Sequence, residues 1–143
     1  MELSHEIYKG LPPVTVLNVV GAVDGSNYTQ LIEYASTLIS GGTEYLLLDL
    51  KGCNFLSSSG LFALHSIALL AHKTPPLDPG QGWQSLHKMT SEEHQFKERF
   101  KIAHLQPNVA RTLDLAGLST VFDIYSDLPE ALAVFRKTNS KYG

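Results

Sequence analysis

The sequence predicts a single α/β domain, and two observations lead to this prediction. Strand-forming and helix-forming segments alternate along the chain, beginning with a strand, a helix and a second strand over residues 14–50. The length of 143 residues and the apolar share of 43% suit one domain with its own core. A disordered chain is excluded, and two full domains are not expected.

The first predicted unit is strand, helix and strand. Residues 14–20 are rich in β-branched side chains and predict a strand, with residues 6–9 pairing beside it as an edge strand. Ser26 or Asn27 then caps a helix with apolar residues at helical spacing, which a glycine pair closes. Residues 45–50 are apolar on both faces, as in a central strand covered on two sides. The crossover between the two long strands should be right-handed.

The second half of the sequence predicts further alternating helices and strands, interrupted by a long insertion. One of the serines at 57–59 caps a helix whose apolar residues nearly encircle it, so neighbours should bury it on every side. An arm at about residues 73–99 follows; it is too long for a simple helix–strand connection and is expected to contain a short helix. The remaining predicted elements are strands at 100–105 and 121–125 and helices at 108–116 and 128–136, the last capped by Asp127.

The low charge of the chain excludes some classes of function. Charged residues make up 17% of the sequence and the formal net charge is −3, so no basic surface is available for nucleic acid or an anionic membrane. The uncharged stretch from Gly52 to His72 has an apolar piece of only about eleven residues, too short to span a bilayer. The N-terminal residues lack the pattern of a secretory signal, so a cytoplasmic location is expected. The lone Cys53 is expected to be a small buried side chain.

The serine turn at residues 57–60 is the main candidate site. It lies between a buried strand and a helix, where free backbone N–H groups and the helix dipole favour an anion. The hydroxyls there can serve as an N-cap, or one of them can accept a phosphoryl group, which would add about −1.5 to −2 charge at pH 7. A catalytic serine is not favoured, because the Gly-x-Ser-x-Gly elbow is absent.

The other chemistry-bearing residues form no recognisable site. The six histidines lack metal-ligand spacing and are expected at surfaces or caps. The glycine pairs lack the pattern of a phosphate-binding loop, and Asp24 and Asp49 lie where turns are expected. No metal and no cofactor is therefore predicted.

Several short segments together carry a family resemblance. They are residues 14–24, 46–50, 55–61, 113–118 and 121–124. In order and spacing, over residues 14–135 apart from the arm, the chain resembles the STAS domain of bacterial anti-sigma factor antagonists. The resemblance implies a small mixed β-sheet of about four to five strands, with helices packed mainly on one side and an edge strand from the N-terminus. The 143 residues would then form a single STAS domain with an insertion at 73–99.

The resemblance also implies a function. Members of this family are not enzymes: they bind a serine kinase that is also an anti-sigma factor, phosphorylation of a serine releases them, and a serine phosphatase restores binding. This chain is therefore expected to be a phosphorylation-controlled binding module in a partner-switching pathway that regulates transcription. It is expected to be a monomer or weak homodimer, with no direct contact to nucleic acid and no insertion into a membrane.

The family motif can be placed on the serine turn. It reads Asp-Ser-Ser/Thr-Gly, so Gly60 matches the glycine, Ser59 the second hydroxyl residue and Ser58 the phosphoacceptor. Ser57 stands where the family has aspartate, so Ser57 and Ser59 are competing acceptors. Asp24 matches an aspartate in the neighbouring loop and is assigned to partner binding together with Ser57, Ser59 and Gly60.

The apolar second helix is the expected contact surface for the kinase, through Leu61, Phe62 and His65. The arm at 73–99 either folds its apolar residues back onto the domain or offers a second contact surface. Two other functions remain open: a cytosolic STAS subunit that docks to a transport system, and a small-molecule or nucleotide sensor.

Overall fold

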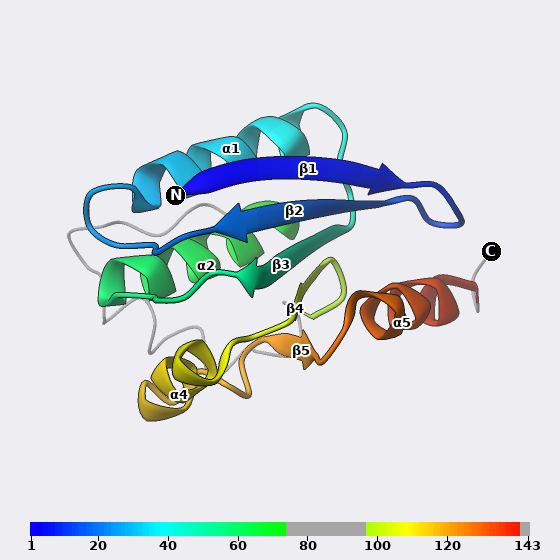
Figure 1. The fold of residues 1–143 in the computed structure, drawn as a ribbon. Coiled ribbons are helices and arrows are strands. Elements are labelled where there is room, and N and C mark those ends of the chain that lie inside the picture. The colour runs from blue at the N-terminus through cyan, green and yellow to red at the C-terminus, as the bar shows by residue number, and fades with distance from the viewer. Residues whose placement is uncertain (74–96, 141–143) are drawn as a thin grey trace.

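The computed structural model describes residues 1–73 and 97–140, so most of the arm and its expected short helix lie outside the described residues. A five-stranded sheet has the order β1-β2-β3-β4-β5; β1 is antiparallel to β2 and the other neighbouring strands are parallel (Figure 1). The strands are β1 (Glu2–Tyr8), β2 (Val14–Val20), β3 (Leu46–Gly52), β4 (Phe100–Ala103) and β5 (Asp123–Tyr125). The helices are α1 (Tyr28–Ser40), α2 (Ser58–Ala71), α4 (Pro107–Leu115) and α5 (Leu128–Ser140). The predicted mixed α/β fold is confirmed.

Four strands end or begin elsewhere than expected, and β3 differs from residues 45–50 by one residue at its start and two at its end. β1 is longer than residues 6–9, because it pairs with β2 along its whole length, from Glu2 opposite Val20 onward. β4 stops early because His104, with φ of 61°, turns the chain. β5 starts late because Val121 belongs to a turn, in which its N–H donates to the carbonyl of Leu118 at 3.0 Å.

The sheet has two unequal faces. Helices α1, α2 and α4 pack on one face, where Leu46, Leu48 and Leu50 of β3 join the larger core. Helix α5 packs on the other face, with Phe135 and Leu47 in a smaller core. Because successive side chains of a strand point to opposite faces, both cores take residues from β3. This confirms the central strand covered on two sides and the placement of helices mainly on one side.

Helix α2 is enclosed by its own domain. Phe62 packs edge-to-face with Tyr28 of α1, with ring centroids 6.1 Å apart. On another side, His65 packs edge-to-face with Phe122, at 5.0 Å. The sequence predicts burial all round this helix, and α1 and the segment before β5 supply the neighbours that the sequence pattern could not identify.

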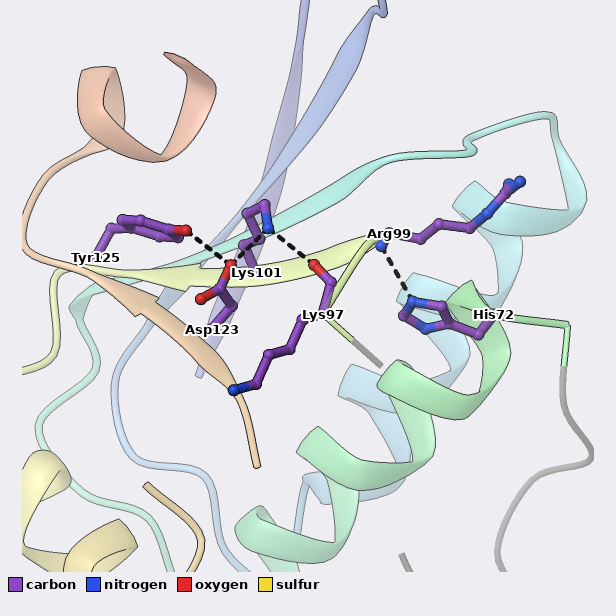
Figure 2. A network of polar contacts seen from close by, with 6 residues as sticks. All are labelled: His72, Lys97, Arg99, Lys101, Asp123 and Tyr125. Carbon is purple, nitrogen blue, oxygen red and sulfur yellow. Dashed lines mark hydrogen bonds and ion pairs between the residues drawn. The ribbon is translucent and has the colours of Figure 1, made fainter. Parts of the chain in front are cut away.

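A buried lysine fixes the start of β4 to the neighbouring strand (Figure 2). Lys101 Nζ lies 2.6 Å from Asp123 Oδ2 on β5 and donates to the Lys97 carbonyl at 2.8 Å. The Tyr125 hydroxyl donates to the same carboxylate oxygen at 2.7 Å. The ammonium also lies 4.9 Å from the centre of the Phe135 ring. The charge is thus buried with a paired carboxylate and an aromatic face, the condition under which a buried charge is tolerated.

Within the described part of the chain, no helix combines the length and apolar character needed to cross a membrane.

Candidate functional site

Two loops meet at the carboxyl ends of β2 and β3, and together they form the candidate site (Figure 1). Val23 forms a parallel bridge with Leu56. The Val23 N–H donates to the Phe55 carbonyl at 2.9 Å, and the Ser57 N–H donates to the Val23 carbonyl at 3.0 Å. The loop after β2 therefore holds the serine turn in place through the backbone.

Ser57 is the N-cap of α2. Its backbone is extended, and its hydroxyl oxygen accepts a hydrogen bond from the Gly60 N–H at 3.3 Å. The side chain is half-buried. The prediction of an N-cap is confirmed for this serine, and its hydroxyl oxygen is already engaged in the capping hydrogen bond.

Ser58 and Ser59 differ in their surroundings. Ser58, the first residue of α2, is exposed, whereas Ser59 is half-buried. The Ser59 hydroxyl faces Gly25 of the neighbouring loop, where an added Cβ would lie 3.7 Å from it. Ser58 is therefore the most accessible of the three hydroxyls. No acidic residue lies in the first turn of the helix, so nothing there opposes an added negative charge at the positive end of the helix dipole.

Gly60 is buried where α2 meets the neighbouring loop. A Cβ on this residue would lie 3.0 Å from Leu56 Cδ2 and 3.1 Å from the Val23 carbonyl oxygen. A backbone oxygen already bonded to Ser57 cannot move aside easily. Glycine is required here because it lets the helix start close to the loop.

Asp24 organises the loop after β2. Its Oδ1 accepts from the Ser26 hydroxyl at 2.5 Å and from the Ser26 N–H at 2.9 Å. These hydrogen bonds hold the pKa of Asp24 below its ordinary value, so the carboxylate is ionised at neutral pH. Asn27 bonds to the Asp24 N–H and to the Ala22 carbonyl, both at 3.0 Å, instead of capping α1 with its side chain. The expectation of a turn aspartate is confirmed.

The expected contact residues on α2 require a correction. Leu61 is 3% exposed, Phe62 8% and His65 0%. These side chains pack between α1 and Phe122 and do not form a surface that a partner can touch. The sequence pattern showed that the helix is apolar on all sides, and the rest of the domain buries this apolar surface.

Phe55 is the exposed apolar side chain next to the serine turn, and the sequence interpretation missed it. It is 49% exposed, two residues before the N-cap of α2. Its loop is held from the other side by α4, where the Asn108 side chain donates to the Asn54 carbonyl. Nearby, Gln106 Nε2 donates to the Lys51 carbonyl at 2.8 Å. The available signal was an aromatic residue two positions before the serine turn, in the connection between a strand and a helix.

The described histidines are placed differently from one another. His65 is buried rather than at a surface or cap: its Nδ1 lies 3.4 Å from the Leu61 carbonyl oxygen, and its Nε2 has no partner among the described residues. Burial lowers the pKa of His65 to about 4.

His104 Nδ1 lies 3.1 Å from Asp49 Oδ1, and Asp49 belongs to β3. The expectation that Asp49 is a turn residue was therefore wrong. In the residues that the structure covers, no three His, Cys, Asp or Glu side chains gather as metal ligands.

Comparison with known proteins identifies the fold to which these loops belong. Residues 7–73 match the family model of the STAS domain. No curated protein matches the sequence.

Three solved structures illustrate the likeness of the fold. An anti-sigma factor antagonist from Mycobacterium paratuberculosis aligns with a TM-score of 0.63 and 22% identity, covering 94% of this chain and 95% of that one. SpoIIAA, an anti-sigma factor antagonist solved in its unphosphorylated form, aligns with a TM-score of 0.58 and 17% identity, covering 94% and 97%. The phosphorylated Bacillus cell fate determinant SpoIIAA aligns with a TM-score of 0.56 and 14% identity, covering 93% and 100%. At these identities the alignments establish a shared fold.

Proposed function

From the premise that this chain has the STAS fold, with residues 7–73 matching the family model, we propose that it is an anti-sigma factor antagonist controlled by phosphorylation of Ser58. It acts as a binding module rather than an enzyme. Its partners are a serine kinase that is also an anti-sigma factor and a serine phosphatase, within a cytoplasmic pathway that regulates transcription.

The exposure of Ser58 is the observation that carries this proposal. Of the three neighbouring serines, Ser57 caps α2 and Ser59 faces Gly25, while Ser58 is exposed. A kinase active site must surround the acceptor hydroxyl, so accessibility favours Ser58 over both competitors. The absence of the family aspartate at residue 57 does not remove the local order of the turn, because Ser57 supplies the cap.

A phosphate on Ser58 would change binding without unfolding the domain. At the N-terminus of a helix, a negative charge is stabilised by typically about 0.3–1 kcal/mol, so α2 should persist. The same charge would lie in a turn that has no other charge and that exposes half of Phe55. A partner that docks an apolar surface there would meet an anion instead, and the complex should weaken.

The test is phosphorylation of the full chain by the kinases encoded beside its gene, with ATP, followed by mapping of the labelled peptide. We expect label on Ser58, retained in Ser57→Ala and lost in Ser58→Ala. A label confined to Ser57, or label outside residues 52–72, would overturn the assignment. As a binding test, Ser58→Asp should weaken the kinase complex at least tenfold, while the surface change Thr120→Asp, at an exposed position, should not.

A further inference from the structure

The outer edge of β1 has no strand paired with it among the described residues. β1 lies at one end of the sheet order and pairs only with β2, in a continuous register over seven residues. Edge strands in soluble proteins are usually protected by charged side chains, especially lysine, by proline, by a bulge or by short length. β1 has the sequence Glu-Leu-Ser-His-Glu-Ile-Tyr, in which Glu2 and Glu6 are the only charged residues; it has neither lysine nor proline, and no irregularity interrupts its pairing.

Apolar side chains accompany this free edge on the face that carries α1. A groove of about 590 Å³ runs between the two elements, and Leu3, His5, Tyr34 and Leu38 are among its lining residues. His5 Nδ1 lies 2.7 Å from the Tyr34 hydroxyl, which fixes the ring in the groove wall. Further along the same face of β1, Ile7 is 63% exposed.

We propose that β1 pairs with β1 of a second copy of this chain, in antiparallel orientation around His5, to form one continuous sheet across a two-fold axis. This inference is independent of the proposed function. Addition of a strand to a free edge satisfies backbone groups on both partners, and the flanking side chains then set the specificity.

The apolar residues of β1 favour this register. When His5 lies opposite His5 of the second copy, all seven residues of both strands pair, and Leu3 lies opposite Ile7 twice. Directly opposite side chains in an antiparallel pair have Cβ atoms about 4.5–5.5 Å apart, so each pair would cover its partner from water. The exposed Ile7 thereby gains the apolar neighbour that it lacks in the single chain.

The charged residues of β1 disfavour the other symmetric registers. In a two-fold symmetric pair of antiparallel strands, residues that lie opposite each other point to the same face of the sheet. The register can therefore change only by steps after which opposite residues still share a face. A step in one direction places Glu2 opposite Glu6 of the second copy. A step in the other direction places Glu6 opposite Glu6 of the second copy. Like charges directly opposite each other are destabilising. In the register around His5, Glu2 instead lies opposite Tyr8 and Glu6 opposite Ser4.

The interface is small, so the dimer should be weak. It consists of one strand from each copy and the side chains beside it, at the low end of specific interfaces, which are typically about 1,200–2,000 Å². We expect association to depend on protein concentration within the range that sedimentation and light scattering cover.

Sedimentation equilibrium of the full chain tests the interface. We expect a monomer–dimer equilibrium that Ile7→Lys weakens at least tenfold, because lysine would replace the apolar partner of Leu3. Leu11→Lys is the matched control, since Leu11 is 88% exposed just beyond β1 and outside the paired residues. A monomer at every concentration, or dimerisation unchanged in Ile7→Lys, would overturn the proposal.

A disulfide test addresses the register separately. His5→Cys should form a covalent dimer under mild oxidation, because residue 5 faces its own copy in the proposed register. Thr120→Cys, at an exposed position away from β1, is the control, and the native Cys53 is buried. If the two variants cross-link to the same extent, the register is wrong.

Discussion

His72 Nε2 accepts a hydrogen bond from the Arg99 backbone N–H at 3.0 Å and so joins the end of α2 to the segment that leads into β4 (Figure 2). The other ring nitrogen, Nδ1, donates to the Ala68 carbonyl at 2.8 Å. This arrangement requires a neutral ring with its proton on Nδ1, since a protonated Nε2 would face an N–H donor. Burial is the largest effect and lowers the pKa of His72, the hydrogen bond to the Ala68 carbonyl opposes it, and the charge of Arg99 adds to the lowering.

Replacing His72 should open this junction. In His72→Phe the Arg99 N–H loses its acceptor while an aromatic ring remains, so we expect a loss of about 1–3 kcal/mol in the free energy of unfolding. Hydrogen exchange of the Arg99 amide should accelerate relative to the native chain. His5→Phe, at an exposed histidine, is the control and should leave that amide unchanged. Unchanged protection of the Arg99 amide in His72→Phe would contradict the prediction.

The buried His65 should make the domain sensitive to acid. Its pKa is about 4 in the folded chain, against an ordinary value of 6.5, so the unfolded chain takes up the proton first as the pH falls. Stability contributed by the neutral ring is therefore present above about pH 6.5 and is lost as the pH falls toward 4, by up to about 3 kcal/mol. His72 acts in the same direction.

Urea denaturation at neutral pH and at about pH 5 measures this effect. His65→Leu should flatten the dependence on pH, and it should cost little at neutral pH because it also removes the buried Nε2 that has no partner among the described residues. A His65→Leu variant as sensitive to acid as the native chain would show that another group is responsible.

Gly60→Ala tests the contact between α2 and the loop after β2. The new Cβ would lie 3.1 Å from the Val23 carbonyl oxygen, and the backbone there would have to shift, so we expect a loss of about 1–3 kcal/mol. Gly25→Ala is the matched control in the same site, because its Cβ would lie at an ordinary 3.7 Å from the Ser59 hydroxyl. Thermal unfolding compares the two, and equal stability of both variants would contradict the packing argument.

The Lys101–Asp123 pair should respond unequally to the removal of each partner. The Lys101 side chain is 5% exposed and that of Asp123 27%. Asp123→Asn would leave a buried ammonium without its carboxylate, at a cost of about 3–5 kcal/mol, whereas Lys101→Met should cost less, because Asp123 is partly solvated. Chemical denaturation of both variants and the double variant gives the coupling energy. A larger loss for Lys101→Met would reverse this assignment.

The two neighbouring serines at the start of α2 should separate a structural from a regulatory role. Ser57→Ala removes the hydroxyl that caps α2 by accepting from the Gly60 N–H, and it should lower the free energy of unfolding by about 1 kcal/mol. Ser58→Ala removes an exposed hydroxyl and should change stability by less than about 0.5 kcal/mol. Denaturation midpoints check both values. If Ser58→Ala were the more destabilising variant, the structural role would belong to Ser58 and not to Ser57.

The elements with strong local signals could be predicted from the sequence. The β-branched run of β2, the apolar run of β3 and the cap residues Ser57 and Asp127 all occur where the local chemistry indicates, and Asp127 Oδ1 accepts from the Glu130 N–H at 2.8 Å. These features depend on near neighbours in the chain, which the sequence displays directly.

The interpretation failed where long-range packing decided the outcome. Leu61, Phe62 and His65 read as a contact surface because an apolar helix needs neighbours, but the pattern does not say whether those neighbours belong to the same chain. Asp49 read as a turn residue because its partner, His104, is 55 residues away. The full length of β1 depends on pairing with β2, since its own alternation is weak.

The sequence by itself determined the order of strands and helices, the serine turn and its neutral surroundings, because periodicity, capping and charge are properties of local stretches. Only the tertiary structure decided which of the three adjacent serines is exposed. That choice depends on the Gly60 N–H, on Gly25 in a loop some thirty residues earlier and on the Val23 carbonyl, which meet only when β2 and β3 lie side by side. The same packing buried the apolar face of α2 and left β1 as an edge.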